Sequence, residues 1–147
     1  MHFPQERIAI ERFRGTALFA FDQGGESDDA LALASDVQYM TGAWQLGPDE
    51  MLLIEGRPPE APYWMIQIMD RWLDTADFRR RRVHLNDAQV ELEADGSYRI
   101  AVSPRDPGLP NWLDTGGRRE GYMAFRWVLA TGVEPPTVRR VPIAEGR

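Results

Sequence analysis

The chain of 147 residues contains no cysteine and no lysine, and only two histidines. The absence of cysteine excludes disulfides, thiolate metal sites and cysteine nucleophiles. Any imidazole must come from His2 or His84, which excludes a histidine-rich metal site and leaves a Ser-His-Asp triad only these two positions. We therefore expect no bound metal and no cofactor.

The charge balance is one-sided. All basic residues are arginines, 17 in number, and 23 acidic residues give a net charge of -6. This balance argues against a general attraction to nucleic acid or to anionic membranes. The first residues, MHFPQERIAIERFRG, are charged throughout, so we expect no signal peptide, no membrane-spanning segment and a cytoplasmic location.

What remains is an ordinary globular composition, 43% hydrophobic and 27% charged, at the length of one domain. Short apolar or alternating runs follow one another at regular spacing, joined by turns rich in glycine, proline and aspartate. This pattern predicts a mainly β fold, an antiparallel sandwich or barrel. We expect residues 1–36 to form an N-terminal extension with one or two short helices, packed on a core of residues 37–147.

Individual strands can be placed with different clarity. Residues 37–46 and 51–56 flank the turn GPDE and predict a hairpin. The apolar run PYWMIQIMD, from Pro62, predicts a central strand buried on both faces. A second hairpin is expected about Asp95 and Gly96, then a last long strand over residues 121–130 and an irregular or edge-strand tail. Two N-terminal segments are less legible: TALFAFD favours a strand, and GGESDDALALAS favours a short helix.

Several of these pieces, in this order, carry a family resemblance: PDEMLLIEG, PYWMIQIMDRW, LEADGSYRIAVSPRDPGLPNWLDTGG and FRW. Between about Gln45 and Pro142 the chain resembles the DUF1214 family of uncharacterised proteins. The resemblance implies a jelly-roll-like β-sandwich and no established activity. Many relatives carry a further N-terminal region, often of the DUF1254 type, so a companion domain or a second copy of the chain is a possible partner.

The segment NWLDTGG offers the first candidate site. Asn111 and Asp114 are turn formers, and Trp112 could plug the end of a sandwich, which is a purely structural account. The functional account makes Trp112, and with it Trp72, a platform for a sugar or aromatic ligand, with Asn111 and Asp114 as polar contacts.

Arg126 is the second candidate, because it shares a strand face with Ala124 and Val128 in an apolar strand. A buried guanidinium needs a partner. That partner is either an internal carboxylate such as Asp70 or Asp114, or the carboxylate or phosphate of a ligand.

A third candidate is the acidic series Asp70, Asp74 and Asp77, which a helix would align on one face. A glycosidase needs a carboxylate pair, but acids beside the arginine run 79–82 more often form a solvated salt-bridge network. We interpret that run as solvated, and His84 as a strand-end residue.

Two functions from different classes follow. The first is a noncatalytic β-sandwich that binds a small polar ligand, such as a sugar or a carboxylate, or a protein partner, with Trp72, Asn111, Trp112, Asp114 and Arg126 at the ligand face. The alternative is a hydrolase or lyase in which Asp70 and Asp114 act as acid and base and Arg126 stabilises an anion. The alternative requires these three residues to line one cavity.

Overall fold

The computed structural model describes residues 19–22, 37–75 and 77–146. The described part is mainly β, as the sequence predicts, and its only helical element is a short 3-10 turn at the end. The predicted N-terminal helices lie outside the described residues. The strands are β1 (Phe19–Asp22), β2 (Val37–Gln45), β3 (Glu50–Gly56), β4 (Tyr63–Met69), β5 (His84–Asn86), β6 (Tyr98–Ser103), β7 (Trp112–Asp114), β8 (Glu120–Val128) and β9 (Thr137–Pro142), followed by η1 (Ile143–Gly146).

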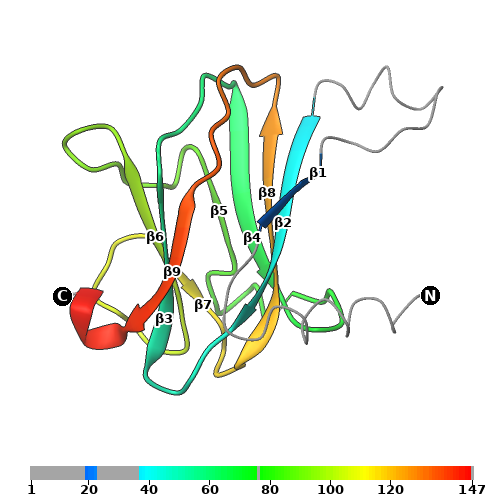
Figure 1. Cartoon of the computed structure of the whole chain (residues 1–147). Helices are drawn as coiled ribbons and strands as arrows, with labels where there is room; N and C mark the ends of the chain where they lie inside the picture. Colours follow the sequence, from blue (N-terminus) through cyan, green and yellow to red (C-terminus); the bar gives the residue numbers. More distant parts are fainter. Residues whose placement is uncertain (1–18, 23–36, 76, 147) are drawn as a thin grey trace.

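These strands form two sheets that face each other (Figure 1). One has five strands in the order β1, β2, β8, β4, β5, and the other has four in the order β7, β6, β3, β9. All pairs are antiparallel except β6 with β7, which is parallel, so the expectation of a purely antiparallel fold is wrong at that edge. The parallel pair arises because residues 104–111 carry the chain back to Ala101, in the middle of β6, before β7 begins.

The space between the sheets is filled by the inward side chains of both. Trp64 and Phe125 from the five-stranded sheet meet Tyr98 from the other, with ring centroids 5.3 and 6.3 Å from that of Tyr98. Trp127 stacks on Phe125, with ring centroids 5.1 Å apart. Each large side chain removed from water contributes about 1.5–3 kcal/mol. Burial of Tyr98 also raises the pKa of its phenol.

The four-stranded sheet has a second apolar cluster on its outer face, away from this core. Met51 and Leu53 of β3, Ala101 of β6 and Val141 of β9 pack there with Ile143 of η1. The chain therefore covers this outer face with its own final turn.

β4 and β8 lie side by side in the five-stranded sheet, and their burial alternates from residue to residue. In β8, Met123, Phe125 and Trp127 face the core, and Arg126 shares the opposite face with Ala124 and Val128, as predicted. β4 is central, as predicted, but it is not buried on both faces, because only Trp64, Ile66 and Ile68 are buried. The alternation shows that one face of this sheet points away from the shared core.

The hairpin expected across GPDE is wrong. β2 pairs with β1 and β8, whereas β3 pairs with β6 and β9, so the turn after Gln45 carries the chain from one sheet to the other. Two hydrogen bonds hold this crossing: the Leu46 N–H donates to the Arg119 carbonyl, and the Gly47 N–H donates to Glu50 Oε1. Glycine, proline and aspartate in GPDE do reverse the chain direction, as predicted. The same turn residues also serve a connection that passes from one sheet to the other.

The hairpin expected about Asp95 and Gly96 is half confirmed. The turn is present, with Gly96 at a φ of 85° and Asp95 Oδ1 accepting hydrogen bonds from the Ser97 N–H and hydroxyl. The strand before it is reduced to one bridge between Leu92 and Tyr98. The residues after it form β6, whose long partner is β3.

Candidate functional site

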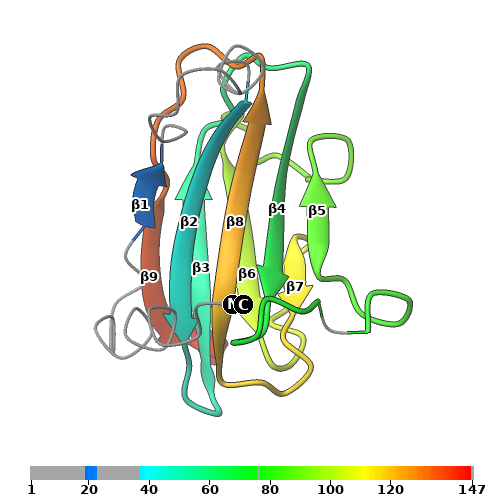
Figure 2. The ribbon, with the colours of Figure 1, turned by 90° about the vertical axis from the view of Figure 1, so that its right-hand side faces the viewer.

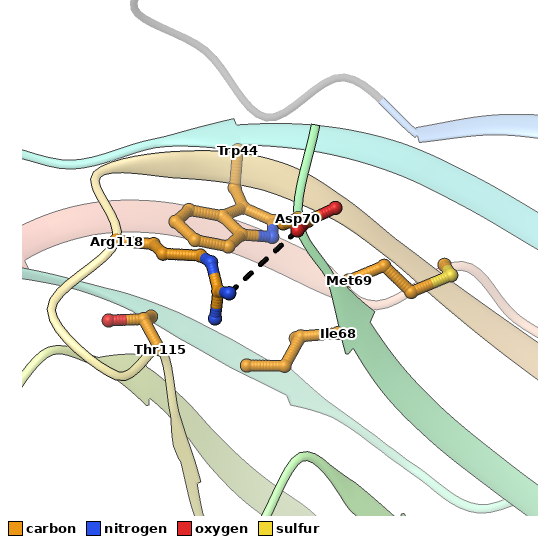
Figure 3. A pocket seen from close by; sticks show the side chains of 6 residues that line it. All are labelled: Trp44, Ile68, Met69, Asp70, Thr115 and Arg118. Atoms are coloured by element: carbon orange, nitrogen blue, oxygen red, sulfur yellow. Dashed lines mark ion pairs between the residues drawn. The ribbon is translucent and has the colours of Figure 1, made fainter. Parts of the chain in front are cut away.

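Two loops meet at the end of the five-stranded sheet where β4 finishes and β8 begins. Because Met69 pairs with Tyr122, the loop that follows β4 lies beside the loop that precedes β8. Figure 3 shows Asp70 and Arg118 facing each other there, with 3.8 Å between Asp70 Oδ2 and Arg118 Nη2. A second ion pair joins the same loops, with 3.4 Å between Arg71 Nη1 and Glu120 Oε1. The pairing of β4 with β8 thus brings residues of distant sequence together.

Asp70 shapes the first of these loops. Its Oδ1 accepts hydrogen bonds from the backbone N–H of Trp72 at 2.8 Å and of Asp74 at 3.0 Å. Its own N–H donates to the Asp74 carbonyl at 2.8 Å. This is the turn chemistry that aspartate favours, and it holds Leu73 at a φ of 65°, a backbone conformation that costs a side-chain-bearing residue about 1–2 kcal/mol. The result is a tight loop that leaves the Trp72 side chain 56% exposed.

An open hollow of about 380 Å³ lies between the two loops. We call it the basic hollow, because the three guanidinium groups that line it outnumber its two carboxylates. The Arg71 guanidinium carbon lies 5.3 Å from the ring centroid of Trp72, within cation–π range. In the part of the chain that the structure describes, the Arg119 guanidinium forms no ion pair. The lining residues are Asp70, Arg71, Trp72, Arg118, Arg119 and Glu120.

A much smaller cavity of about 10 Å³ shares Asp70 and Arg118 with the basic hollow. Trp44, Ile68, Met69 and Thr115 complete its wall (Figure 3). This volume holds about one water molecule. The small cavity therefore adds no room for a ligand of its own.

A glycine keeps this end of the sheet closely packed. A Cβ on Gly121 would collide with the Met69 carbonyl oxygen and would lie 2.6 Å from the Trp44 ring. The Trp44 indole N–H donates to the Tyr122 carbonyl at 3.0 Å, which fixes that ring. The backbone that carries the basic hollow is therefore held against the core.

Asn111, a predicted ligand contact, is fully occupied by the backbone. It is 2% exposed. Its Oδ1 accepts from the Glu91 N–H at 2.8 Å, and its Nδ2 donates to the Glu91 and Arg99 carbonyls at 2.8 and 2.9 Å. A buried amide whose hydrogen bonds are satisfied in this way ties the segment before β6 to the edge of the four-stranded sheet.

Trp112 and Asp114 also make structural contacts. The half-buried Trp112 donates its indole N–H to the Ser103 carbonyl at 3.1 Å. Asp114 accepts from Arg81 Nη1 at 2.9 Å and from the Gly116 N–H at 2.8 Å. Asp114 is next to Thr115 of the small cavity, but neither it nor Trp112 lines the basic hollow.

Arg126 lies in the middle of β8 and is exposed, so its expected burial is wrong. Strand alternation places it on the outer face of the sheet, where its guanidinium carbon is 5.8 Å from the ring centroid of Tyr39. The two carboxylates considered as its partners pair elsewhere, Asp70 with Arg118 and Asp114 with Arg81. Asp70, Asp114 and Arg126 do not together line either of the two spaces described above.

The helical alignment of Asp70, Asp74 and Asp77 is wrong, because the described residues of this loop form turns and no helix. The arginine run behaves as a solvated segment, as predicted: all four side chains are exposed. Arg80 pairs with Asp77, with 3.6 Å between Nε and Oδ2. The solvated interpretation is confirmed, but Arg80 with Asp77 is the one ion pair that the described residues show between the run and the acidic series, because Asp70 pairs with Arg118 instead.

Sequence reasoning missed four of the six residues around the basic hollow: Arg71, Arg118, Arg119 and Glu120. The sequence contains one signal that could have found them. The two arginines of GGRRE directly precede a predicted strand, and Asp70 and Arg71 directly follow another. The sequence does not reveal the register of β4 against β8, and this register is what places GGRRE beside Asp70 and Arg71.

Titratable groups give little further chemistry. Burial lowers the pKa of His84 on β5, which favours the neutral imidazole. Over the residues that are described, no three histidine, aspartate or glutamate side chains gather as a metal site. Within the same residues, no helix has the length and apolarity needed to cross a membrane.

Comparison with known families identifies the chain. The model of the DUF1214 family, described as a protein of unknown function, matches residues 48–131. Because this match covers more than half of the chain, the protein belongs to the DUF1214 family, as its motifs indicate. No curated protein matches it.

Two solved structures resemble the chain. An uncharacterised protein from Burkholderia cenocepacia is 30% identical, with a TM-score of 0.76 over 88% of this chain and 35% of its own. A structural-genomics target from Vibrio parahaemolyticus is 18% identical, with a TM-score of 0.59 over 72% of this chain and 31% of its own, and supports the fold alone. The chain thus spans about a third of the length of these relatives.

Proposed function

We propose that this DUF1214 protein is a noncatalytic module that binds a small polar ligand bearing a carboxylate, and that the basic hollow receives it. The observation that supports the proposal is the group of three guanidiniums around a space of about 380 Å³, with an exposed indole among them. This volume falls within the range typical of small-molecule sites, about 300–1,000 Å³.

The arginines differ in how available they are. Arg71 has Glu120 at 3.4 Å, and Arg118 has Asp70 at 3.8 Å, which is longer than a hydrogen bond. Arg119 has no carboxylate among the described residues, so it is the first contact for an incoming anion. A guanidinium recognises a carboxylate through two parallel N–H donors, and Arg118 can turn from Asp70 to supply a second such contact.

Trp72 selects the rest of the ligand. Its indole is 56% exposed and presents an apolar surface beside the arginines. A sugar ring or a small aromatic ring can stack on such a surface while its carboxylate reaches Arg119. Sugar acids and aromatic carboxylates are therefore the expected ligands, ahead of neutral sugars.

A thermal-shift series with the full chain tests the proposal. We expect glucuronate or benzoate to raise the melting temperature of the wild type, and glucose to leave it unchanged. Arg119→Gln and Trp72→Ala should remove the shift while keeping the fold, because both side chains are exposed. Arg79→Gln is the control, since it removes an exposed arginine of the loop after β4 that does not line the hollow. Equal shifts in Arg119→Gln and the wild type would exclude the basic hollow as the site.

The alternative function, a hydrolase or lyase with Asp70 and Asp114 as acid and base and Arg126 as anion stabiliser, stays a prediction. The contacts give it no support, because Asp70 and Asp114 hold turns and ion pairs. Turnover of a glycoside or ester panel by the wild type, lost in Asp114→Asn, would favour it over simple binding.

We also infer a jelly-roll-like sandwich, with residues 1–36 packed on the core as an extension of one domain. Its support is that the chain crosses between the sheets after β2, β3, β5, β7 and β8. A cytoplasmic location is part of the same proposal, and fractionation of cells expressing the full chain tests it.

A further inference from the structure

The charges around the basic hollow come from two short strings of the chain. These strings lie where the chain leaves β4 beside the start of β8 (Figure 2). Two ion pairs join them, Asp70 with Arg118 and Arg71 with Glu120, so four of the five charges are paired. Arg119 has no carboxylate partner among the described residues. The three guanidiniums and two carboxylates therefore give the lining one net positive charge.

A ligand with one carboxylate matches this charge. The carboxylate can pair with Arg119 and cancel the excess charge, and no ion pair has to break. A second carboxylate finds no such partner, because the two other guanidiniums already face Asp70 and Glu120. It would give the hollow a net negative charge close to two like charges, which disfavours binding.

Asp70 is the more firmly fixed of the two carboxylates. Its Oδ1 accepts from the backbone N–H groups of Trp72 and Asp74 at 2.8 and 3.0 Å, and 13% of its side chain is exposed. It also lines the small cavity, which has room for about one water molecule, so little solvent screens its charge on that side. If Arg118 turns toward a ligand, the negative charge of Asp70 therefore stays in place.

Glu120 is held less firmly. Its Oε1 lies 3.4 Å from Arg71 Nη1, and the two side chains are 31% and 39% exposed. Glu120 and Arg71 can therefore move together away from a ligand while their charges stay paired. Of the two carboxylates, Asp70 is thus the one whose charge remains in the hollow when a ligand binds.

We propose that the basic hollow selects ligands with a single negative charge, and that Asp70 sets this selectivity. The selectivity rests on the proposed function, because it concerns the ligand of the same site. It narrows the expected ligands to monoanions such as benzoate and glucuronate, and it makes dicarboxylates poor ligands. Asp70 acts through its charge, as a specificity-determining residue.

Calorimetric titration of the full chain at low, constant ionic strength tests the selectivity. The probes are benzoate, isophthalate, which adds a second carboxylate to the same ring, and isophthalamate, which has the shape of isophthalate but one charge. We expect benzoate and isophthalamate to bind with similar Kd values. Isophthalate should bind about fivefold more weakly than isophthalamate, because one unit charge is repelled in a solvated site. Isophthalate binding as tightly as isophthalamate, or more tightly, overturns the proposal.

Asp70→Asn tests the role of Asp70. The amide oxygen can still accept from the Trp72 and Asp74 N–H groups, so the loop is kept while the charge is removed. This variant should reduce the preference for isophthalamate over isophthalate by about fivefold. Asp77→Asn is the matched control, because it removes the same charge from the loop after β4 at a residue that does not line the hollow. Equal changes of the preference in the two variants would contradict the role of Asp70.

Salt dependence provides a second readout if Asp70→Asn does not fold. Because salt screens charge, the preference of the wild type for isophthalamate should disappear between about 0.02 M and 0.5 M salt. A preference that salt leaves unchanged would mean that shape excludes isophthalate, and it would overturn the proposal. The absence of binding by both benzoate and isophthalamate is a distinct result, because it would contradict the proposed function itself and the selectivity with it.

Discussion

The outer face of the four-stranded sheet carries four side chains between 0% and 5% exposed, whereas the outer face of the five-stranded sheet is uneven, with Tyr39 39% exposed and Ala43 5% exposed. The first face is closed by Ile143 of the chain's own last turn. Beyond that cluster, the same face is charged, with Glu55 between Arg99 and Arg139 at 3.7 and 3.4 Å. The outer face of one sheet is thus closed by the chain's own last turn, whereas the outer face of the other is exposed at Tyr39 and buried at Ala43.

The largest expected difference between the two outer faces is in the loss of stability when one side chain on each face is truncated. Leu53→Ala removes a buried side chain from the cluster on the four-stranded sheet and should lower the free energy of unfolding by about 2–5 kcal/mol. Met65→Ala, on the other outer face, should cost about 1 kcal/mol or less, because Met65 is only half-buried. Urea unfolding of both variants at low protein concentration measures the difference. Equal losses would mean that both faces are covered within one chain.

The edge of the four-stranded sheet offers a second test of how the chain completes this sheet. Asn111→Ala leaves the Glu91 N–H and two carbonyls without their partner and should cost about 1–3 kcal/mol. Asn86→Ala is the control, because its amide accepts hydrogen bonds in an exposed turn and a smaller loss is expected. Chemical denaturation measures both. If Asn111→Ala unfolded like the wild type, Asn111 would be available for the ligand role that the sequence suggested.

The sequence predicts the features of this fold that depend on neighbouring residues better than those that depend on residues far apart in the chain. The alternation in β8 and the turn at Gly96 are local, and both are confirmed. The pairing of β2 and β3 was wrong, because GPDE specifies a reversal but not the sheet that receives the next strand. Propensity and pattern do not fix such long-range register, since it depends on which buried faces meet.

The candidate site shows the same limit. Asp70 and Trp72 were singled out, and both line the basic hollow. Arg118 and Arg119 were not, because nothing local connects GGRRE to the loop after β4. Arg126 was expected to be buried, since an apolar strand surrounds it in sequence. Arg126 is on an outer face with several apolar side chains. The sequence alone does not distinguish such a face from one that is buried in the core.

A smaller effect is expected from Arg126 on the outer face of the five-stranded sheet. Arg126→Ala loses the contact with Tyr39, which should contribute about 0.5–1 kcal/mol at an exposed position. A double-mutant cycle with Tyr39→Leu isolates this contact. A coupling of several kcal/mol would contradict the exposed position of Arg126.

The smallest expected effect comes from His84, whose strand partner is Gln67 at the edge of the same sheet. Burial lowers the pKa of His84 below its ordinary value of 6.5, so the folded state binds fewer protons than the unfolded state in the interval between the two values. Stability should therefore fall as the pH falls from about 6.5 through the lowered pKa, and level off below it. His84→Gln should remove this part of the pH dependence in urea unfolding between pH 7 and pH 5.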